Sequence, residues 1–167
     1  MSRGFVKEDD LEHAGTDMPE RPISAHPNYV TPSGLKLLNA QATTLDALRA
    51  TLTGRKDDQM AQQQLAKVDR DLRYVSARLE QAILVDPSLQ PQDSVLFGAT
   101  VTVEDENEQR QQFHIVGEDE ANIAENKVSY VSPIARALIG RKIGDSVVWQ
   151  RPAGNLQLEI INIHYAI

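Results

Sequence analysis

Acidic residues are the closely spaced groups in this chain whose types suggest chemistry. Asp57 and Asp58 are adjacent and an acidic run spans residues 118–120, and carboxylate oxygens of this kind are preferred ligands of divalent cations. The histidines, by contrast, have no neighbours at metal-ligand spacing; they are His13, His26, His114 and His164. The sequence also lacks a glycine-rich phosphate loop and a nucleophile elbow. We therefore expect a protein that is not an enzyme, with no catalytic residue, no resident metal and no cofactor.

Both acidic groups also have a structural interpretation. Asp57 or Asp58 follows a predicted helix break and can cap the next helix, where negative charge meets the positive end of the helix dipole. Arg55 and Lys56 partly offset the charge of the two aspartates, which weakens the metal interpretation. The run at 118–120 could hold a divalent cation but is typical of a solvated loop. We expect Asp57 and Asp58 to act as helix caps, and a functional contact of these two residues stays open.

The composition is that of a soluble globular protein. Of 167 residues, 41% are hydrophobic and 25% are charged, and no apolar run approaches the ~18–20 residues of a membrane helix. The first residues lack the apolar stretch of a secretory signal. The absence of cysteine excludes disulfides and thiolate metal sites and fits a reducing cytosol. A net charge of −7 argues against nonspecific binding to bare DNA or RNA, which requires a basic surface. We expect an acidic, cytoplasmic protein without membrane contact.

Residues 1–30 predict an extended or disordered arm. This segment has three basic residues, six acidic residues, three prolines and almost no apolar periodicity, and proline disfavours both helices and central strands. Phe5-Val6 and Tyr29-Val30 are the anchor points that its sequence offers. We expect residues 1–24 to be mobile and the stable core to begin near Tyr29.

Residues 31–86 predict a helical hairpin. Thr31 and Pro32 suit the N-cap and the first position of a helix, and apolar residues then recur every three or four positions in two runs separated by a short break. These positions are Leu35, Leu38, Ala42, Leu45, Leu48, Leu52, Ala61, Leu65, Val68, Leu72, Val75, Leu79 and Ala82. No third helix of similar length completes a bundle. We therefore expect an antiparallel coiled coil whose helices span residues 32–52 and 58–84.

Residues 87–167 predict an α+β domain. Ser132 and Pro133 are strong start signals for a short helix over residues 134–139. Several antiparallel strands around this helix complete the fold, with a phase slip between Ile160 and Ile161. The alternation of apolar residues places these strands at 95–103, 111–116, 128–131, 147–149 and 156–163.

Ordered motifs across residues 95–165 carry a family resemblance. They are Phe97-Gly98-Ala99-Thr100-Val101, the runs at 115–121 and 128–140, Gly144-Asp145, Pro152-x-Gly154 and the closing strand at 160–165. Together they resemble the C-terminal domain of bacterial transcription elongation factors of the GreA/GreB family, which bind RNA polymerase. The start and end of the predicted hairpin, at 31–35 and 71–86, resemble the corresponding parts of the Gre coiled coil.

The resemblance implies an FKBP-like fold for residues 87–167 and RNA polymerase as the partner of this domain. It places the polymerase contacts beside the loop at 117–121 and at the following helix start, which gives Asp119, Glu120, Ser132, Pro133, Ile134 and Arg136. We expect a monomer that meets nucleic acid, DNA included, only through the polymerase complex. Pro133→Asp with Ile134→Lys should abolish binding while the domain stays folded.

The predicted hairpin departs from the Gre family at its tip. Gre factors have a longer first helix and a tip with a Gly-Asp-x-Ser-Glu-Asn-type run, whose acidic residues reach through the polymerase secondary channel and help to hold the second catalytic Mg²⁺. Here the tip is the run at 53–58, and a first helix of about 20 residues reaches roughly 30 Å at ~1.5 Å per residue. Because a carboxylate oxygen must lie within ~2.1 Å of Mg²⁺, we expect a noncatalytic regulator at the channel mouth.

Three other functions stay open. The chain could stimulate transcript cleavage through Asp57 and Asp58, with indirect contact to the Mg²⁺ of the polymerase active site. It could belong to the related short-coil class named as regulators of nucleoside diphosphate kinase, which shares the C-terminal domain. A peptidyl-prolyl isomerase is disfavoured because such enzymes use an aromatic-lined pocket, whereas several aromatic residues of this domain fall in strand-core phase; these residues are Phe97, Phe113, Tyr130, Trp149 and Tyr165.

Overall fold

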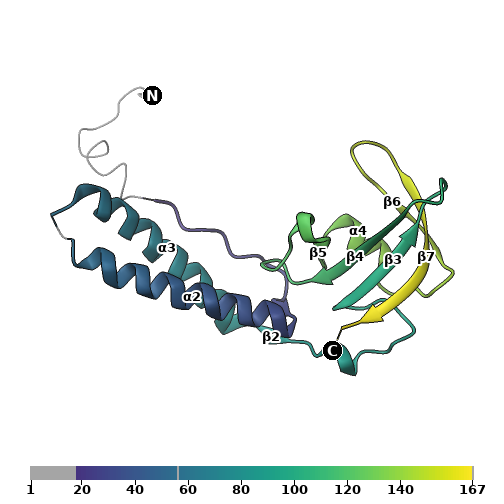
Figure 1. The fold of residues 1–167 in the computed structure, drawn as a ribbon, viewed down its shortest axis with the longest axis horizontal. Helices are drawn as coiled ribbons and strands as arrows, with labels where there is room; N and C mark the ends of the chain where they lie inside the picture. The colour runs from purple at the N-terminus through teal and green to yellow at the C-terminus, as the bar shows by residue number, and fades with distance from the viewer. Residues whose placement is uncertain (1–17, 56, 167) are drawn as a thin grey trace. The chain divides into compact units, whose positions relative to one another are not determined.

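The chain forms two compact units in the computed structural model, which describes residues 18–55 and 57–166. One unit comprises Leu38–Gln81 together with the described residues 18–26, and the other comprises Pro27–Leu37 and Ala82–Ile167 (Figure 1). Within the described part of the chain, no helix is both long enough and apolar enough to cross a membrane.

Two helices form the hairpin of the first unit. They are α2 (Pro32–Thr53), whose first residues belong to the second unit, and α3 (Gln59–Gln81) (Figure 1). Leu52, Ala61 and Val68 are buried between them, and Leu45, Leu65 and Leu72 pack against these three. All six belong to the predicted apolar runs, so the helical hairpin is confirmed.

Leu48 is an exception in the predicted seam, because its side chain is exposed. The alternation of four and three residues that leads from Leu38 to Leu52 passes through Arg49 rather than Leu48. Arg49 bridges the two helices instead, since its Nε lies 2.6 Å from Oδ1 of Asp69 on α3.

Helix α3 ends at Gln81, three residues before its predicted end. Ile83–Leu84 forms β2, which pairs in parallel with β1 (Tyr29–Val30). The Ile83 N–H donates to the Asn28 carbonyl oxygen at 2.8 Å. Pairing with a distant segment therefore overrides the helical periodicity that continues into residues 82–84.

Residues 18–28 contain no helix or strand, yet Glu20 and Arg21 form ion pairs with α3. The sequence predicts a mobile segment here and does not reveal these ion pairs. Contacts between single charged side chains and a distant helix leave no periodic signal in the sequence. Of the two predicted anchors, Tyr29–Val30 forms β1, and Phe5-Val6 lies outside the described residues.

A five-stranded sheet of order β5-β4-β3-β7-β6 dominates the second unit (Figure 1). Its strands are β3 (Ala99–Glu104), β4 (Arg110–Val116), β5 (Lys127–Ser129), β6 (Ser146–Trp149) and β7 (Leu156–Tyr165). Neighbouring strands are antiparallel except β4 and β5, which run in parallel. The predicted antiparallel sheet is therefore wrong for this one pair. The register of β3 on β7 shifts so that Ile161 is an extra residue, as the phase slip predicts.

Helix α4 (Pro133–Leu138) packs on this sheet and closes an α+β domain. Its buried residues Ile134, Ala135 and Leu138 join the core with one face of the strands. Most of the core residues are aliphatic, which agrees with the low aromatic content of the chain. Two short 3-10 turns, Pro87–Leu89 and Ile123–Glu125, lie in the connections.

We predict that Leu138→Ala lowers the free energy of unfolding by about 2–5 kcal/mol, because the fully buried leucine leaves a cavity in the core. The control is Leu89→Ala, since the Leu89 side chain is 81% exposed and such surface changes stay within about 0.5 kcal/mol. Urea denaturation of the full chain measures both. Equal losses in the two variants would contradict the described core.

Candidate functional site

A buried hydrogen bond joins the start of α2 to the acidic run. The Thr31 hydroxyl donates to Oε1 of Glu120 at 2.6 Å and accepts from the Gly34 N–H at 2.9 Å. Thr31 is therefore the N-cap of α2, as its position in the sequence predicts. Glu120 is only 6% exposed, so this predicted docking residue holds the fold together and is not available to a partner.

Two glycines allow the acidic run to approach residues 29–34. A Cβ at Gly34 would lie 2.8 Å from Oε1 of Glu120, and a Cβ at Gly117 would collide with the Tyr29 carbonyl oxygen. Both distances are shorter than van der Waals contact permits. The loop that begins at Gly117 therefore packs against β1 and the first turn of α2. The sequence predicts a solvated loop at 118–120 and does not predict this packing.

His114 and Lys127 flank the buried carboxylate. The Lys127 Nζ lies 3.8 Å from Oε2 of Glu120 and 3.3 Å from Oε1 of Glu125. Burial lowers the pKa of His114 below its usual value, and the positive charge of Lys127 lowers it further, while Glu120 acts in the opposite direction. A neutral, half-buried histidine on a strand has a structural role here.

The start of α4 presents its residues to different surroundings. The Ser132 hydroxyl accepts from the Ala135 N–H at 3.3 Å and donates to the Ser129 carbonyl oxygen at 2.6 Å, which fixes the predicted cap. Pro133 and Arg136 are exposed, whereas Ile134 is 3% exposed and belongs to the core. The expectation that Ile134→Lys leaves the domain folded is therefore wrong, because it would place a charge in the core.

An apolar groove of about 760 Å³ opens beside this helix start. Ser132, Pro133 and Ile134 line it, whereas Asp119, Glu120 and Arg136 are not among its lining residues. Arg136 lines a separate hollow of about 360 Å³ with Pro133 and Val148. The structure thus brings together three of the six predicted docking residues in the groove.

The groove also contains apolar residues outside the six predicted docking positions; they are Phe113, Ile123, Val128 and Trp149. The rings of Phe113 and Trp149 pack edge to face with their centroids 5.5 Å apart. Ile123 is 87% exposed at this groove, and a large apolar residue in a loop between two strands is the signal that could have identified it. No cluster of three or more metal-binding side chains occurs among residues 18–55 and 57–166.

At the hairpin tip, Asp58 is engaged as a cap. Its Oδ1 accepts from the Met60 and Ala61 N–H groups at 3.0 and 3.3 Å, at the start of α3. Asp57 and Arg55 are exposed beside it, and Lys56 lies outside the described residues. Both of these backbone hydrogen bonds go to Asp58, and Asp57 accepts neither of them.

Comparison with known proteins gives consistent matches. A family model described as transcription elongation factor, GreA/GreB, C-term, matches residues 90–165. The chain is 34% identical over 153 residues to transcription elongation factor GreB of Neisseria meningitidis serogroup B, across 83% of this chain and 94% of that protein. It is 39% identical over 107 residues to transcription elongation factor GreA of Halorhodospira halophila, across 63% of this chain and 68% of that protein.

Solved structures with likeness to this chain include two related proteins. The crystal structure of GreA factor homolog 1 (Gfh1) of Thermus thermophilus is 22% identical, with a TM-score of 0.39 over 83% of this chain and 99% of that one. The transcription elongation factor GreA/GreB of Nitrosomonas europaea is 23% identical, with a TM-score of 0.42 over the same shares of the two chains.

We predict that Thr31→Val destabilises the protein by about 2–5 kcal/mol. The change removes a helix cap (~0.5–2 kcal/mol) and a hydrogen bond to a buried carboxylate (~1.5–3 kcal/mol). Thr31→Ser is the matched control, because it keeps the hydroxyl and should stay close to the parent. Chemical denaturation of both variants checks this, and equal stability of the valine and serine variants would refute the role given to the hydroxyl.

Proposed function

The chain belongs to the GreA/GreB family of transcription elongation factors, and from that premise we propose that it binds RNA polymerase and regulates elongation at the secondary channel without stimulating transcript cleavage. In this role the protein is not itself an enzyme and needs no resident cofactor. It acts as a monomer in the cytoplasm and meets nucleic acid only within the polymerase complex.

The hairpin tip is the observation that carries this proposal. Helix α2 has 22 residues, a length of about 33 Å at ~1.5 Å per residue, and its tip lacks the acidic run that the resemblance assigns to cleavage factors. Asp58 accepts two backbone hydrogen bonds as a helix cap, which leaves it fewer lone pairs for a metal ion. Asp57 remains as a single exposed carboxylate next to basic residues.

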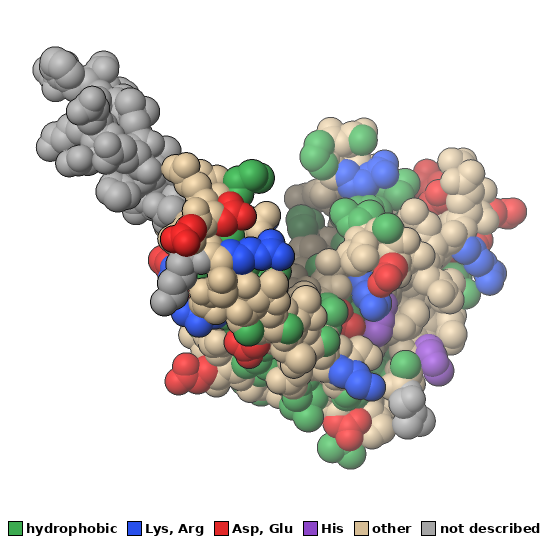
Figure 2. Space-filling view, turned by 60° about the vertical axis from the view of Figure 1, so that its left-hand side comes forward, with side chains coloured by type: hydrophobic (Ala, Val, Ile, Leu, Met, Phe, Trp, Pro, Cys, Tyr) green, Lys and Arg blue, Asp and Glu red, His purple; other side chains and the backbone are tan. Residues whose placement is uncertain are grey.

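The groove beside α4 supports the docking part of the proposal. It combines the exposed Ile123 and Pro133 with the edge-to-face pair of Phe113 and Trp149, and exposed apolar surface of this kind marks contacts with other proteins. Acidic and basic side chains are interspersed on the face in Figure 2. Such a surface, with a net charge of −7, favours a protein partner over bare nucleic acid.

We predict that the protein stimulates no cleavage in a backtracked polymerase complex and inhibits cleavage by a GreB factor in proportion to its concentration. Asp57→Ala with Asp58→Ala should keep this competition, while the lost cap lowers stability by about 0.5–2 kcal/mol. Gel analysis of the labelled transcript measures both the cleavage by the protein alone and its inhibition of the GreB factor. Mg²⁺-dependent cleavage by the parent protein that disappears in the double variant would instead establish a cleavage stimulator.

We predict that Ile123→Asp weakens binding to polymerase at least tenfold, or about 1.4 kcal/mol, because it places a charge at the apolar groove. The fold should persist, since the side chain is exposed. Leu89→Asp is the matched control, as Leu89 is similarly exposed and does not line the groove. Fluorescence anisotropy with labelled protein gives the affinities, and equal affinity of the two variants would remove the groove as the docking site.

A further inference from the structure

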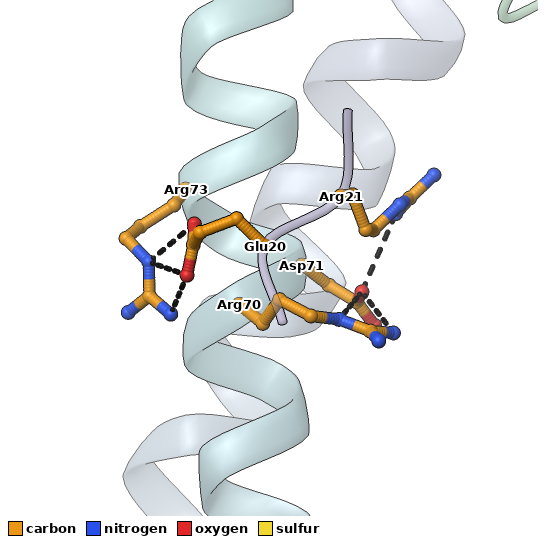
Figure 3. A network of polar contacts seen from close by, with 5 residues as sticks. All are labelled: Glu20, Arg21, Arg70, Asp71 and Arg73. Carbon is orange, nitrogen blue, oxygen red and sulfur yellow. Dashed lines mark hydrogen bonds and ion pairs between the residues drawn. The ribbon is translucent and has the colours of Figure 1, made fainter. Parts of the chain in front are cut away.

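The described N-terminal residues lie against α3 through a network of charged side chains (Figure 3). Glu20 holds Arg73 with both carboxylate oxygens: the Arg73 Nε lies 3.0 and 2.9 Å from Oε1 and Oε2, and Nη2 lies 2.5 Å from Oε1. The hydrogen bonds from Arg73 hold the pKa of Glu20 below its usual value. Both groups are therefore charged at neutral pH.

The next residue makes a second contact with the same helix. The Arg21 guanidinium carbon lies 3.8 Å from the centre of the Tyr74 ring, a distance typical of a cation–π interaction. Its Nη1 lies 3.3 Å from Oδ1 of Asp71, which also accepts from Arg70. The acidic Glu20 thus binds the basic Arg73, and the basic Arg21 next to it contacts the Tyr74 ring and the Asp71 carboxylate on the same helix.

The contact is confined to the surface. Glu20 and Arg73 are 60% and 57% exposed, and none of residues 18–26 is buried. Burial begins at Asn28, just beyond Pro27, whose carbonyl oxygen accepts from the Tyr130 hydroxyl. Exposed ion pairs are individually weak and are screened by salt, so this segment can leave α3 while the chain from Pro27 onward stays in place.

We propose that residues 18–26 form a strap that reversibly covers Arg73 and Tyr74 on α3 and thereby restrains the hairpin from engaging polymerase. This inference rests on the function proposed above. The Glu20 carboxylate occupies Arg73 in the geometry that an acidic side chain of the polymerase would adopt. A strap also widens the hairpin, whose helices are each ~10–12 Å wide.

Release of the strap therefore has two consequences. It makes the Arg73 guanidinium available to a carboxylate of the partner, and it narrows the hairpin that enters the channel. Glu20 and Arg21 separate from α3 together, because they are adjacent in the chain and contact residues 71–74 of one helical turn. The partner thus competes with the strap for the same charged groups.

The first test follows the strap without polymerase. An arginine stacked on a tyrosine has its δ-proton NMR resonances shifted upfield by the ring current, so the parent protein should show this shift for Arg21 at low salt. Glu20→Arg should return the resonances to random-coil values, and Arg73→Glu should do the same. The exchanged pair, Glu20→Arg with Arg73→Glu, should restore the upfield shift. Random-coil values in the parent protein would overturn the strap.

The second test measures affinity for core polymerase free of nucleic acid. Glu20→Arg should bind at least fivefold more tightly than the parent, whereas Arg73→Glu should not, because it releases the strap but lacks the guanidinium. Glu80→Arg is the matched control, since it makes the same charge change at an exposed position of α3. An equal gain from Glu80→Arg, or an unchanged affinity of Glu20→Arg, would overturn the restraint.

Two further outcomes are distinguishable. A gain from Glu20→Arg that appears only when RNA is present would assign Arg73 to phosphate groups and overturn the polymerase carboxylate as its partner. If no form of the protein binds polymerase while the Arg21 shift and its recovery in the exchanged pair persist, the proposed function fails and the restraint falls with it, but the docked strap stands.

Discussion

The second unit depends on one buried carboxylate. Glu120 is almost inaccessible to water, and burial of a polar group is costly unless nearby groups compensate for the lost water. Thr31 donates to one oxygen and Lys127 lies beside the other. Glu120 therefore connects the start of α2 and the first residue of β5 to the acidic loop, and the missing Cβ of Gly34 makes the approach of the first turn of α2 possible.

The same separation of buried and exposed groups shapes the proposed docking groove. Ser132 fixes the start of α4, so that Pro133 points to solvent while Ile134 enters the core. The core is filled largely by aliphatic side chains, and Trp149 at the sheet edge contributes to the groove with Phe113. The lining of this groove is largely apolar, which suits the proposed contact with a protein partner.

The hairpin uses charge differently. Its short apolar seam is accompanied by an exposed ion pair of Arg49 with Asp69, and such a pair favours one register of the two helices more than it adds stability. Further along α3, Arg73 finds its partner in the N-terminal segment. Such pairs weaken as ionic strength rises. Salt therefore weakens the charged contacts on the hairpin surface but does not screen the packing of the aliphatic core in the second unit.

The sequence by itself determined the features that local chemistry records. Apolar spacing defined the hairpin, Thr31 and Ser132 marked two helix starts, and the phase slip at Ile161 located the bulge. Only the tertiary structure decided that Glu120 is buried, that Ile134 faces the core, and that Glu20 and Arg21 contact α3. Periodicity and capping act over a few residues, whereas Thr31 and Glu120 are 89 positions apart. Contacts at that separation arise from packing of whole elements, which no local pattern encodes.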